Sequence, residues 1–340
     1  MKNNVTVAVL VSGGVDSLVA AALLKDQYSD VTGLHFLTGY HDLTTGQVTA
    51  LSRQLDMPIH VLDFTAVFKQ EIIDCFIAAY LRGETPNPCM RCNRRIKFGE
   101  ALVEAGALGA EILATGHYCN VSRSDDAVEL RKGTDTNKEQ SYFLAFVGPS
   151  DLAHTCFPVG DKTKSEVMAI ARERGLTPVT RQESQDICFV QAATYADFIQ
   201  AHTGITPAPG PIVDMQGNQI GEHSGIHQFT VGQRRGINCP AERPYYVAAI
   251  DAVNNKLTVG FREELLVPSF FVRDMNWLLD PAVDVDVKVR YRHPAVPARL
   301  TLTDDQRVRV DLQEPQFGIA PGQGAVFYDG DTVVGGGVII

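Results

Sequence analysis

The strongest constraint on the fold is an alternation of strand and helix patterns over the first 115 residues. Val5–Val11 is a continuous apolar, β-branched run, which is typical of a strand buried on both faces. Ser12–Gly14 ends this run, and apolar residues at helical spacing follow from Asp16. Further strand patterns occupy Val31–Leu37, Ile59–Phe64 and Ile112–Thr115. The alternation indicates βαβ units and a parallel sheet, which binds ligands at the carboxyl ends of its strands.

Helical periodicity fills the intervals between these strands and then stops. The predicted helices are Gln47–Leu55, Ala66–Leu81, Ile96–Ala105, Lys164–Arg174 and Thr194–His202. After three prolines at 207, 209 and 211 the chain becomes short-stranded and glycine-rich, and beyond about residue 270 only strand patterns remain. Short strands at such spacing indicate a barrel or a sandwich. We therefore predict an α/β domain at 1–205, a small mixed α+β module at 206–268 and a β domain at 269–340.

Charge and cysteine content narrow the function classes. Acids outnumber bases 40 to 30 over 340 residues, and the net charge of −10 argues against a uniformly basic nucleic-acid surface. That average hides basic clusters near 82–97 and 288–299. No apolar run approaches the ~20 residues of a membrane span, and the start does not resemble a signal peptide, so we expect a cytoplasmic protein. The seven cysteines then predict reduced, metal-binding or catalytic thiols rather than a disulfide framework.

The turn Ser12-Gly13-Gly14-Val15-Asp16-Ser17 is the first candidate site. Glycines let an anion approach the backbone, and the start of the following helix offers unpaired N–H groups. No lysine follows at Walker spacing. A tight strand-to-helix turn would need the two glycines but not both serines and the aspartate. The sequence therefore predicts a phosphate-binding loop.

Two cysteine-bearing segments are the other candidate sites. Pro86–Asn93 contains Cys89 and Cys92 as C-x-x-C, a spacing compatible with half a zinc site, a redox pair or two cluster ligands. Its prolines predict non-helical backbone, and five bases against two acids over 82–100 predict lowered thiol pKa values. Glu183–Phe189 carries Cys188 after a polar run, which favours a site over a cysteine buried in a strand.

These motifs carry a family resemblance. SGGVDS resembles the pyrophosphate-binding loop of ATP pyrophosphatases, and the three sites together resemble the bacterial tRNA-specific 2-thiouridylase family. Further matches run along nearly the whole chain, at Gly116–Tyr118, Lys138–Leu144, Phe157–Val167, Thr230–Gly236, Lys288–Arg292 and Ala320–Gln323. The resemblance implies an N-terminal ATP-pyrophosphatase domain with the adenine nucleotide α-hydrolase-like fold, a central tRNA-binding module and a C-terminal β-barrel.

The resemblance also implies an activity and site residues. The family adenylates the carbon-2 oxygen of the wobble uridine with ATP and Mg²⁺ and replaces that oxygen by sulfur. ATP is expected at Leu10, Val11, Ser12, Gly13, Gly14, Val15, Asp16, Ser17, Phe36 and Gly116. The anticodon stem-loop of tRNA is expected at Asn87, Pro88, Cys89, His117, Lys138, Glu139, Gln140, Arg290, Tyr291 and Gln323. Cys188 would receive a persulfide from a sulfur-relay protein or cysteine desulfurase. Cys92 would release that sulfur and end in a transient disulfide with Cys188.

The sequence departs from the family pattern in three places. Cys89 stands where the PNPD-x-x-C loop usually has aspartate, Glu139 replaces the aspartate of KDQ, and the connection 36–47 is short. Cys89 motivates a second hypothesis, in which Cys89, Cys92 and Cys188 hold a [4Fe–4S] cluster with one open iron. The other four cysteines (Cys75, Cys119, Cys156 and Cys239) are interpreted as structural. Two rival functions remain: an amide-forming adenylating synthetase acting on a small molecule, and a non-catalytic RNA-binding module.

Overall fold

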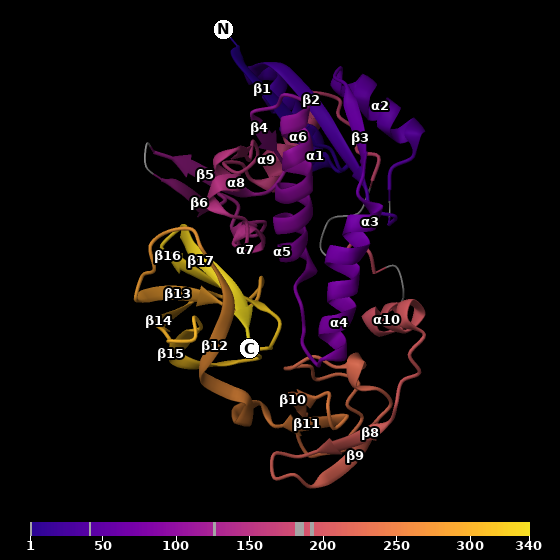
Figure 1. The fold of residues 1–340 in the computed structure, drawn as a ribbon, viewed down its shortest axis with the longest axis vertical. Helices are drawn as coiled ribbons and strands as arrows, with labels where there is room; N and C mark the ends of the chain where they lie inside the picture. Colours follow the sequence, from indigo (N-terminus) through magenta and orange to yellow (C-terminus); the bar gives the residue numbers. More distant parts are fainter. Residues whose placement is uncertain (1, 41, 125–126, 181–186, 191–193) are drawn as a thin grey trace.

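The computed structural model describes residues 2–40, 42–124, 127–180, 187–190 and 194–340 (Figure 1). Its first part is a five-stranded parallel sheet with the order β3-β2-β1-β4-β7. The strands are β1 (Asn3–Leu10), β2 (Tyr28–Leu37), β3 (Ile59–Asp63), β4 (Ile112–Ala114) and β7 (Thr155–Cys156). The predicted α/β class with a parallel sheet is confirmed. The strand order reverses direction between β1 and β4, and parallel sheets bind ligands at such a switch point.

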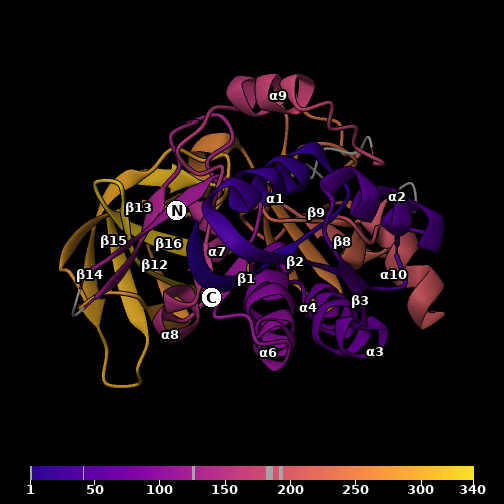
Figure 2. The ribbon, with the colours of Figure 1, turned by 90° about the horizontal axis from the view of Figure 1, so that it is seen from above.

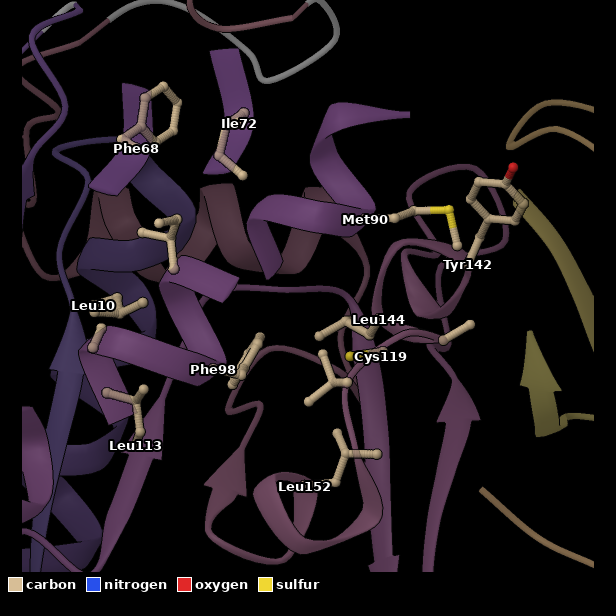
Figure 3. Packing of buried hydrophobic residues seen from close by; sticks show 14 of the residues in the cluster. Leu10, Phe68, Ile72, Met90, Phe98, Leu113, Cys119, Tyr142, Leu144 and Leu152 are labelled. Carbon is tan, nitrogen blue, oxygen red and sulfur yellow. The ribbon is translucent and has the colours of Figure 1, made fainter. Parts of the chain in front are cut away.

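Helices cover both faces of this sheet, as Figure 2 shows from above. Alternate residues of β1 point to opposite faces, because side chains alternate along a strand. Val7 and Val9 pack with α1 (Val15–Gln27) and α2 (Thr45–Leu55), and α9 (Lys164–Glu173) packs on α1. Ala8 and Leu10 pack with the helical segments of the other face, whose core Figure 3 shows. Those segments are α3 (Thr65–Phe68), η1 (Lys69–Asp74), α4 (Cys75–Leu81), α5 (Pro88–Cys92), η2 (Asn93–Glu100) and α6 (Ala101–Ala107).

The middle of the chain forms a small mixed sheet after helix α10 (Tyr195–Thr203). Its order is β10-β11-β8-β9, and only the β11–β8 pair is parallel. The elements are β8 (Gly210–Val213), β9 (Gln219–His223), η3 (Ile226–Gln228), β10 (Tyr246–Asp251), β11 (Lys256–Gly260) and η4 (Arg262–Leu265). Among the described residues, no helix has the length and apolar character needed to cross a membrane.

Six antiparallel strands then close into a barrel through the pairing of β12 with β17. They are β12 (Leu266–Trp277), β13 (Asp284–Lys288), β14 (Val296–Leu302), β15 (Val308–Phe317), β16 (Gly324–Asp329) and β17 (Thr332–Ile339). A hairpin from the first part, β5 (Cys119–Arg123) and β6 (Val128–Lys132), adds to β17. Two short helices, α7 (Ser141–Leu144) and α8 (Pro149–Ala153), follow it. The predicted barrel is confirmed, whereas the hairpin was not anticipated.

The backbone around the C-x-x-C motif corrects the prediction of non-helical structure there. Pro88 is the first residue of α5, and the helical path continues through η2 and α6 to Ala107 rather than starting at Ile96. Proline fits the first turn of a helix because that N–H has no intrahelical partner. Asn87 caps the helix, its side chain accepting a hydrogen bond from the backbone N–H of Met90 at 3.3 Å.

Candidate active site

The loop Ser12–Ser17 lies at the carboxyl end of β1, at the switch point of the sheet. Ser17 Oγ donates to the Gly14 carbonyl at 2.8 Å, and Ser12 Oγ lies 3.2 Å from Ser17 Oγ. Gly13 has φ of +81°, and a Cβ there would lie 2.7 Å from Val179. The loop is therefore preorganised by its own hydroxyls and by a glycine that no other residue replaces without strain.

Asp16 is held by two side chains from elsewhere in the chain. Lys164 Nζ lies 2.7 and 2.9 Å from the two carboxylate oxygens, and the Tyr118 hydroxyl donates to Oδ1 at 2.7 Å. Both members of the ion pair are partly exposed, so the pair can exchange partners with a ligand. Tyr118 and Lys164 lie in two of the motifs that carry the family resemblance, but that resemblance implied no role for either residue. Lys164 is the first residue of α9, directly after the N-cap Thr163. The capping box of Thr163 and Glu166 is the sequence signal that could have placed Lys164 at a helix start.

Helices α1 and α9 run parallel beside this loop. Lys164 at the start of α9 meets Asp16 at the start of α1, while Arg174 just after α9 bonds to Ala22 and Asp26 near the end of α1. Two helix N-termini, each with a positive dipole end, therefore point to the same place. Together with Lys164, they make the mouth of the loop favourable for a polyanion.

The other predicted nucleotide residues divide into two kinds. Leu10 and Val11 are buried in the core, and the Val11 carbonyl is already bonded to His35 Nδ1 at 2.9 Å, so their contribution is to shape the loop. Phe36 lies near the carboxyl end of β2, with its ring 5.7 Å from Phe64. Gly116 packs directly on α1, since a Cβ there would lie 2.8 Å from the Asp16 carbonyl carbon.

The segment after β4 connects the loop to the cysteines. His117 is buried, with Nδ1 2.7 Å from Thr115 Oγ1 and Nε2 3.4 Å from Lys97 Nζ. An ammonium only donates, so Nε2 is the acceptor and Nδ1 carries the proton. Burial, reinforced by the Lys97 charge, lowers the pKa of His117 well below its usual value, and the ring is neutral.

The three predicted cysteines lie close together, because Cys188 raises the pKa of Cys89 and of Cys92, and Cys89 also raises the pKa of Cys92. Cys89 and Cys92 are one turn apart on α5, and Cys188 approaches from another segment. Cys188 is exposed, while Cys89 and Cys92 are partly buried. The polar run at 183–186 that marked this site lies outside the described residues. No disulfide joins any of the seven cysteines, all of which fall among the described residues.

The predicted lowering of the thiol pKa values is wrong in direction. Burial raises the pKa of Cys89 to about 11 and that of Cys92 to about 12. The surrounding protein also raises the pKa of Cys188 by displacing part of its water, although this residue is still exposed to solvent. The arginines do not compensate, because Arg91 pairs with Glu71 at 2.8 Å and Arg95 lies 3.4 Å from the same carboxylate. Only the Lys97 ammonium acts in the lowering direction on all three thiols.

The barrel fixes the segment that leads into α5. Gln323 Nε2 donates to the Thr85 carbonyl at 2.9 Å, and Thr85 N–H donates to the Pro321 carbonyl at 2.7 Å. A Cβ at Gly324 would lie 2.4 Å from the sulfur of Met90, which is fully buried. The position of Cys89 and Cys92 therefore depends on residues more than 200 positions away.

The remaining predicted RNA-binding residues flank this contact between the first part and the barrel. Gln140 Oε1 accepts from Tyr118 N–H at 2.9 Å, and Glu139 is buried, with Oε1 2.5 Å from Ser141 N. Arg290 donates to the Val231 carbonyl at 2.8 Å and ties the barrel to the middle module. Tyr291 lies over Phe143 with ring centroids 4.5 Å apart. Lys138 is half-buried in the loop before Glu139.

The donor set at the cysteines differs from that of a site for a single metal ion. Among the described residues, no group of three or more His, Cys, Asp or Glu side chains is arranged to hold a metal ion. A [4Fe–4S] cluster takes each thiolate on a different iron, so its cysteines stand farther apart than the ligands of one ion. Three thiols that influence one another electrostatically suit such a cluster in residue type.

Comparisons with known proteins cover almost the entire chain. Residues 5–192 match the tRNA methyl transferase HUP domain, residues 196–261 the tRNA methyl transferase PRC-barrel domain and residues 267–339 the aminomethyltransferase beta-barrel domain. The chain is 54% identical to a tRNA-specific 2-thiouridylase MnmA of Desulfosudis oleivorans, over 99% of this chain and 95% of that protein. Proteins of the same name from Rhodospirillum centenum and Moorella thermoacetica are 43% and 41% identical, over 98% and 97% of this chain and 91% and 98% of theirs.

Proposed function

The chain belongs to the tRNA-specific 2-thiouridylase family, and from that premise we propose how its residues divide the reaction between them. It is a tRNA sulfurtransferase that uses ATP to convert a uridine of tRNA into 2-thiouridine. The target is the wobble uridine. Oxygen on carbon 2 is a poor leaving group, and adenylation converts it into one that departs as AMP.

The loop Ser12–Ser17 binds the pyrophosphate end of ATP. Its glycine backbone, its two hydroxyls and the paired N-termini of α1 and α9 supply donors for phosphate oxygens. Lys164 exchanges Asp16 for a phosphate, which frees the carboxylate of Asp16. That carboxylate together with the phosphates is the set of hard oxygen ligands that Mg²⁺ prefers. A bound Mg²⁺ would neutralise charge on the leaving pyrophosphate.

The target uracil reaches the cysteines as a flipped base. Enzymes that act on a base take it out of the stack, and the N-cap turn at Asn87–Cys89 faces the thiols that must approach carbon 2. We assign contacts with the rest of the tRNA to His117, Lys138–Gln140, Arg290–Tyr291 and Gln323, of which Gln323 also holds Thr85 just before this turn. The domain 1–205 carries the chemistry, while the module 206–268 and the barrel 269–340 orient the tRNA.

The exposure of the cysteines supports a division of labour in sulfur transfer. Cys188 is the exposed thiol, so a sulfur-relay protein or a cysteine desulfurase can load it with a persulfide. The terminal sulfur attacks carbon 2 of the adenylated base, and AMP leaves with the oxygen. Cys92 then attacks Cys188 Sγ, which breaks the S–S bond to the nucleoside and forms a Cys92–Cys188 disulfide. An external thiol reduces that disulfide and completes the cycle.

Cys89 supports a second route for sulfur. With Cys92 and Cys188 it makes a set of three thiols that would hold a [4Fe–4S] cluster on three irons. Such a cluster would supply one open iron for hydrosulfide. Anaerobically purified protein would then contain about four irons and four labile sulfides per chain, and Cys89→Asp would lose them. Iron-free protein with full thiolation activity would exclude this route and leave the persulfide.

The observation that carries the proposed function is the segment Thr115–Tyr118, which touches Asp16 on one side and approaches the cysteines through Lys97 on the other. The test incubates the protein with ATP, Mg²⁺, a sulfur donor and unmodified tRNA, and measures 2-thiouridine after nuclease digestion. Wild type should form it, Asp16→Ala and Cys92→Ser should not, and Cys75→Ser should behave as wild type.

The same assay separates the two rival functions. An amide-forming synthetase would release AMP with a small amine and without tRNA. A non-catalytic RNA-binding module would bind tRNA equally well after Asp16→Ala and would form no 2-thiouridine in any variant. Thiolation by Asp16→Ala at the wild-type rate would show that this loop is not the nucleotide site. The first two results would contradict the proposed function, and the third would contradict the role proposed for Ser12–Ser17.

A further inference from the structure

The hairpin β5–β6 and the barrel enclose a cleft of about 650 Å³, within the range of ligand-binding pockets. We call it the hairpin–barrel cleft. Strand β6 supplies Arg131 and Lys132, the end of β13 supplies Lys288, the loop after it supplies His293, and Glu139 and Asp331 are its acids. In Figure 1 the hairpin lies directly above the barrel strands that complete this cleft. None of the motif residues expected to contact tRNA, apart from Glu139, lines it.

The charges in the cleft are unevenly compensated. Lys132 Nζ donates to the Gly330 carbonyl at 2.7 Å and lies 3.7 Å from Asp331, so these two side chains offset each other. Lys288 has no carboxylate within ion-pairing distance among the residues that the structure describes. Its ammonium faces the rings of Tyr291 and Tyr142 at 5.6 and 6.0 Å. Arg131 is exposed and reaches a carboxylate only at 4.0 Å.

The acid in the depth of the cleft, Glu139, offsets only part of this excess. Glu139 is buried, and its Oε1 is engaged by Ser141 N–H at 2.5 Å, which holds the carboxylate back from the opening. Burial lowers the pKa of Lys288, and this effect and the nearby Lys132 charge outweigh the Glu139 carboxylate, which raises it. Two basic side chains, Arg131 and Lys288, therefore remain available to an anion entering from solvent.

A chain of side-chain contacts links the cleft to the cysteine site. Asn93, next to Cys92, donates to the Phe143 carbonyl at 2.9 Å. The Phe143 ring packs on Tyr291, and Tyr291 contacts Lys288. A nucleic acid that places one base at Cys92 continues along its backbone on both sides, and a neighbouring phosphate is the anion most readily brought to such a position.

We propose that the hairpin–barrel cleft binds a backbone phosphate of the RNA substrate, close in sequence to the modified uridine, through Lys288 and Arg131. This inference rests on the proposed function, because it takes tRNA to be the substrate. The contact is sequence-independent and positions the strand, as phosphate contacts generally do. It also gives the hairpin, an addition to the barrel sheet, a role in the reaction.

The test measures the affinity of full-length protein for unmodified tRNA over a series of monovalent salt concentrations. Lys288→Gln and Arg131→Gln should each weaken binding about five- to tenfold near 0.1 M salt and reduce the slope of log K against log salt by about one. Asp331→Asn, which removes the counter-charge of Lys132, should strengthen binding. Arg309→Gln is the matched control, since this barrel arginine pairs with Asp311 at 2.8 Å outside the cleft.

The outcomes distinguish the two levels of inference. If wild type binds and thiolates tRNA while Lys288→Gln and Arg131→Gln match Arg309→Gln in affinity and slope, the cleft proposal is wrong and the proposed function stands. If wild type neither binds nor thiolates tRNA, both are wrong. Should Lys288→Gln melt well below wild type, the exposed Arg131→Gln decides alone.

Discussion

Gly116→Ala tests whether the segment after β4 positions the nucleotide loop. A Cβ at this position would lie 2.8 Å from the Asp16 carbonyl carbon and 2.9 Å from both the Asp16 oxygen and the Ser17 nitrogen. All three are backbone atoms, so no side chain can rotate away. An ordinary contact of about 3.5 Å requires the start of α1 or the segment after β4 to move by about 0.7 Å.

The expected cost of this movement has two parts. Overpacking of this kind destabilises a protein by about 1–3 kcal/mol. Because a displacement approaching 1 Å in a positioning group can cost about 100-fold in rate, we expect tRNA-dependent AMP formation to fall by about 10- to 100-fold. ATP binding should weaken as well, because the displaced backbone atoms belong to the first residues of α1, which follow the loop.

The assay compares thermal unfolding, ATP binding and AMP formation with those of a matched variant. Gly106→Ala is that control, because Gly106 lies within α6 and a Cβ there meets nothing within 4 Å. Alanine in a helix interior is favoured over glycine by about 0.5–1 kcal/mol, so this variant should be as stable as wild type or more so. If Gly116→Ala retains wild-type stability and ATP affinity, the close packing that we infer is wrong.

Three further predictions concern the ion pair and the thiols. Lys164→Met should weaken ATP binding, measured by calorimetry, by about 10-fold or more, because a charged hydrogen bond of about 1.5–3 kcal/mol is lost. Arg174→Met is the control: it breaks the ion pair of Arg174 with Asp26 between α9 and α1 and should leave ATP binding unchanged. In a time course with iodoacetamide at pH 8, the exposed Cys188 should be alkylated before Cys92, whose pKa is about 12; equal rates by mass spectrometry would contradict the burial argument. Lys97→Met removes the cation that lowers all three thiol pKa values, so alkylation of Cys92 should slow at pH 8 and its rate profile should move to higher pH, and a profile moved to lower pH would overturn this assignment.

Much of the fold could be predicted from local patterns. The apolar run that forms β1 and the glycine turn after it predicted the parallel sheet and the position of the loop Ser12–Ser17 at its carboxyl edge. The alternation in Val283–Tyr291 indicated a barrel or sandwich strand. The hairpin β5–β6 was missed because its strands are short, polar and exposed at their ends, and its pairing with β17 involves residues 200 positions apart.

The candidate site was predictable in its residue types but not in its electrostatics. Counting bases around Cys89 and Cys92 suggested lowered pKa values, because a sequence shows charge but not burial or pairing. Glu71, 20 positions before Arg91, takes up the arginine charge. Likewise the partner of Asp16 is Lys164, 148 positions later, which only the parallel packing of α1 and α9 brings into place.

One segment, Thr115–Tyr118, explains how adenylation and sulfur transfer would share a site in the proposed reaction. Gly116 and Tyr118 face α1 and Asp16, while His117, with Thr115 beside it, faces Lys97, the cation that acts on all three thiols. The segment follows β4, the neighbour of β1 at the switch point. In the proposed reaction, a uracil lying across this segment would have its carbon-2 oxygen near the loop Ser12–Ser17 and its carbon 2 open to the cysteines. An insertion of one residue here would exchange the two faces, and it should abolish thiolation and weaken ATP binding in a protein that still binds tRNA.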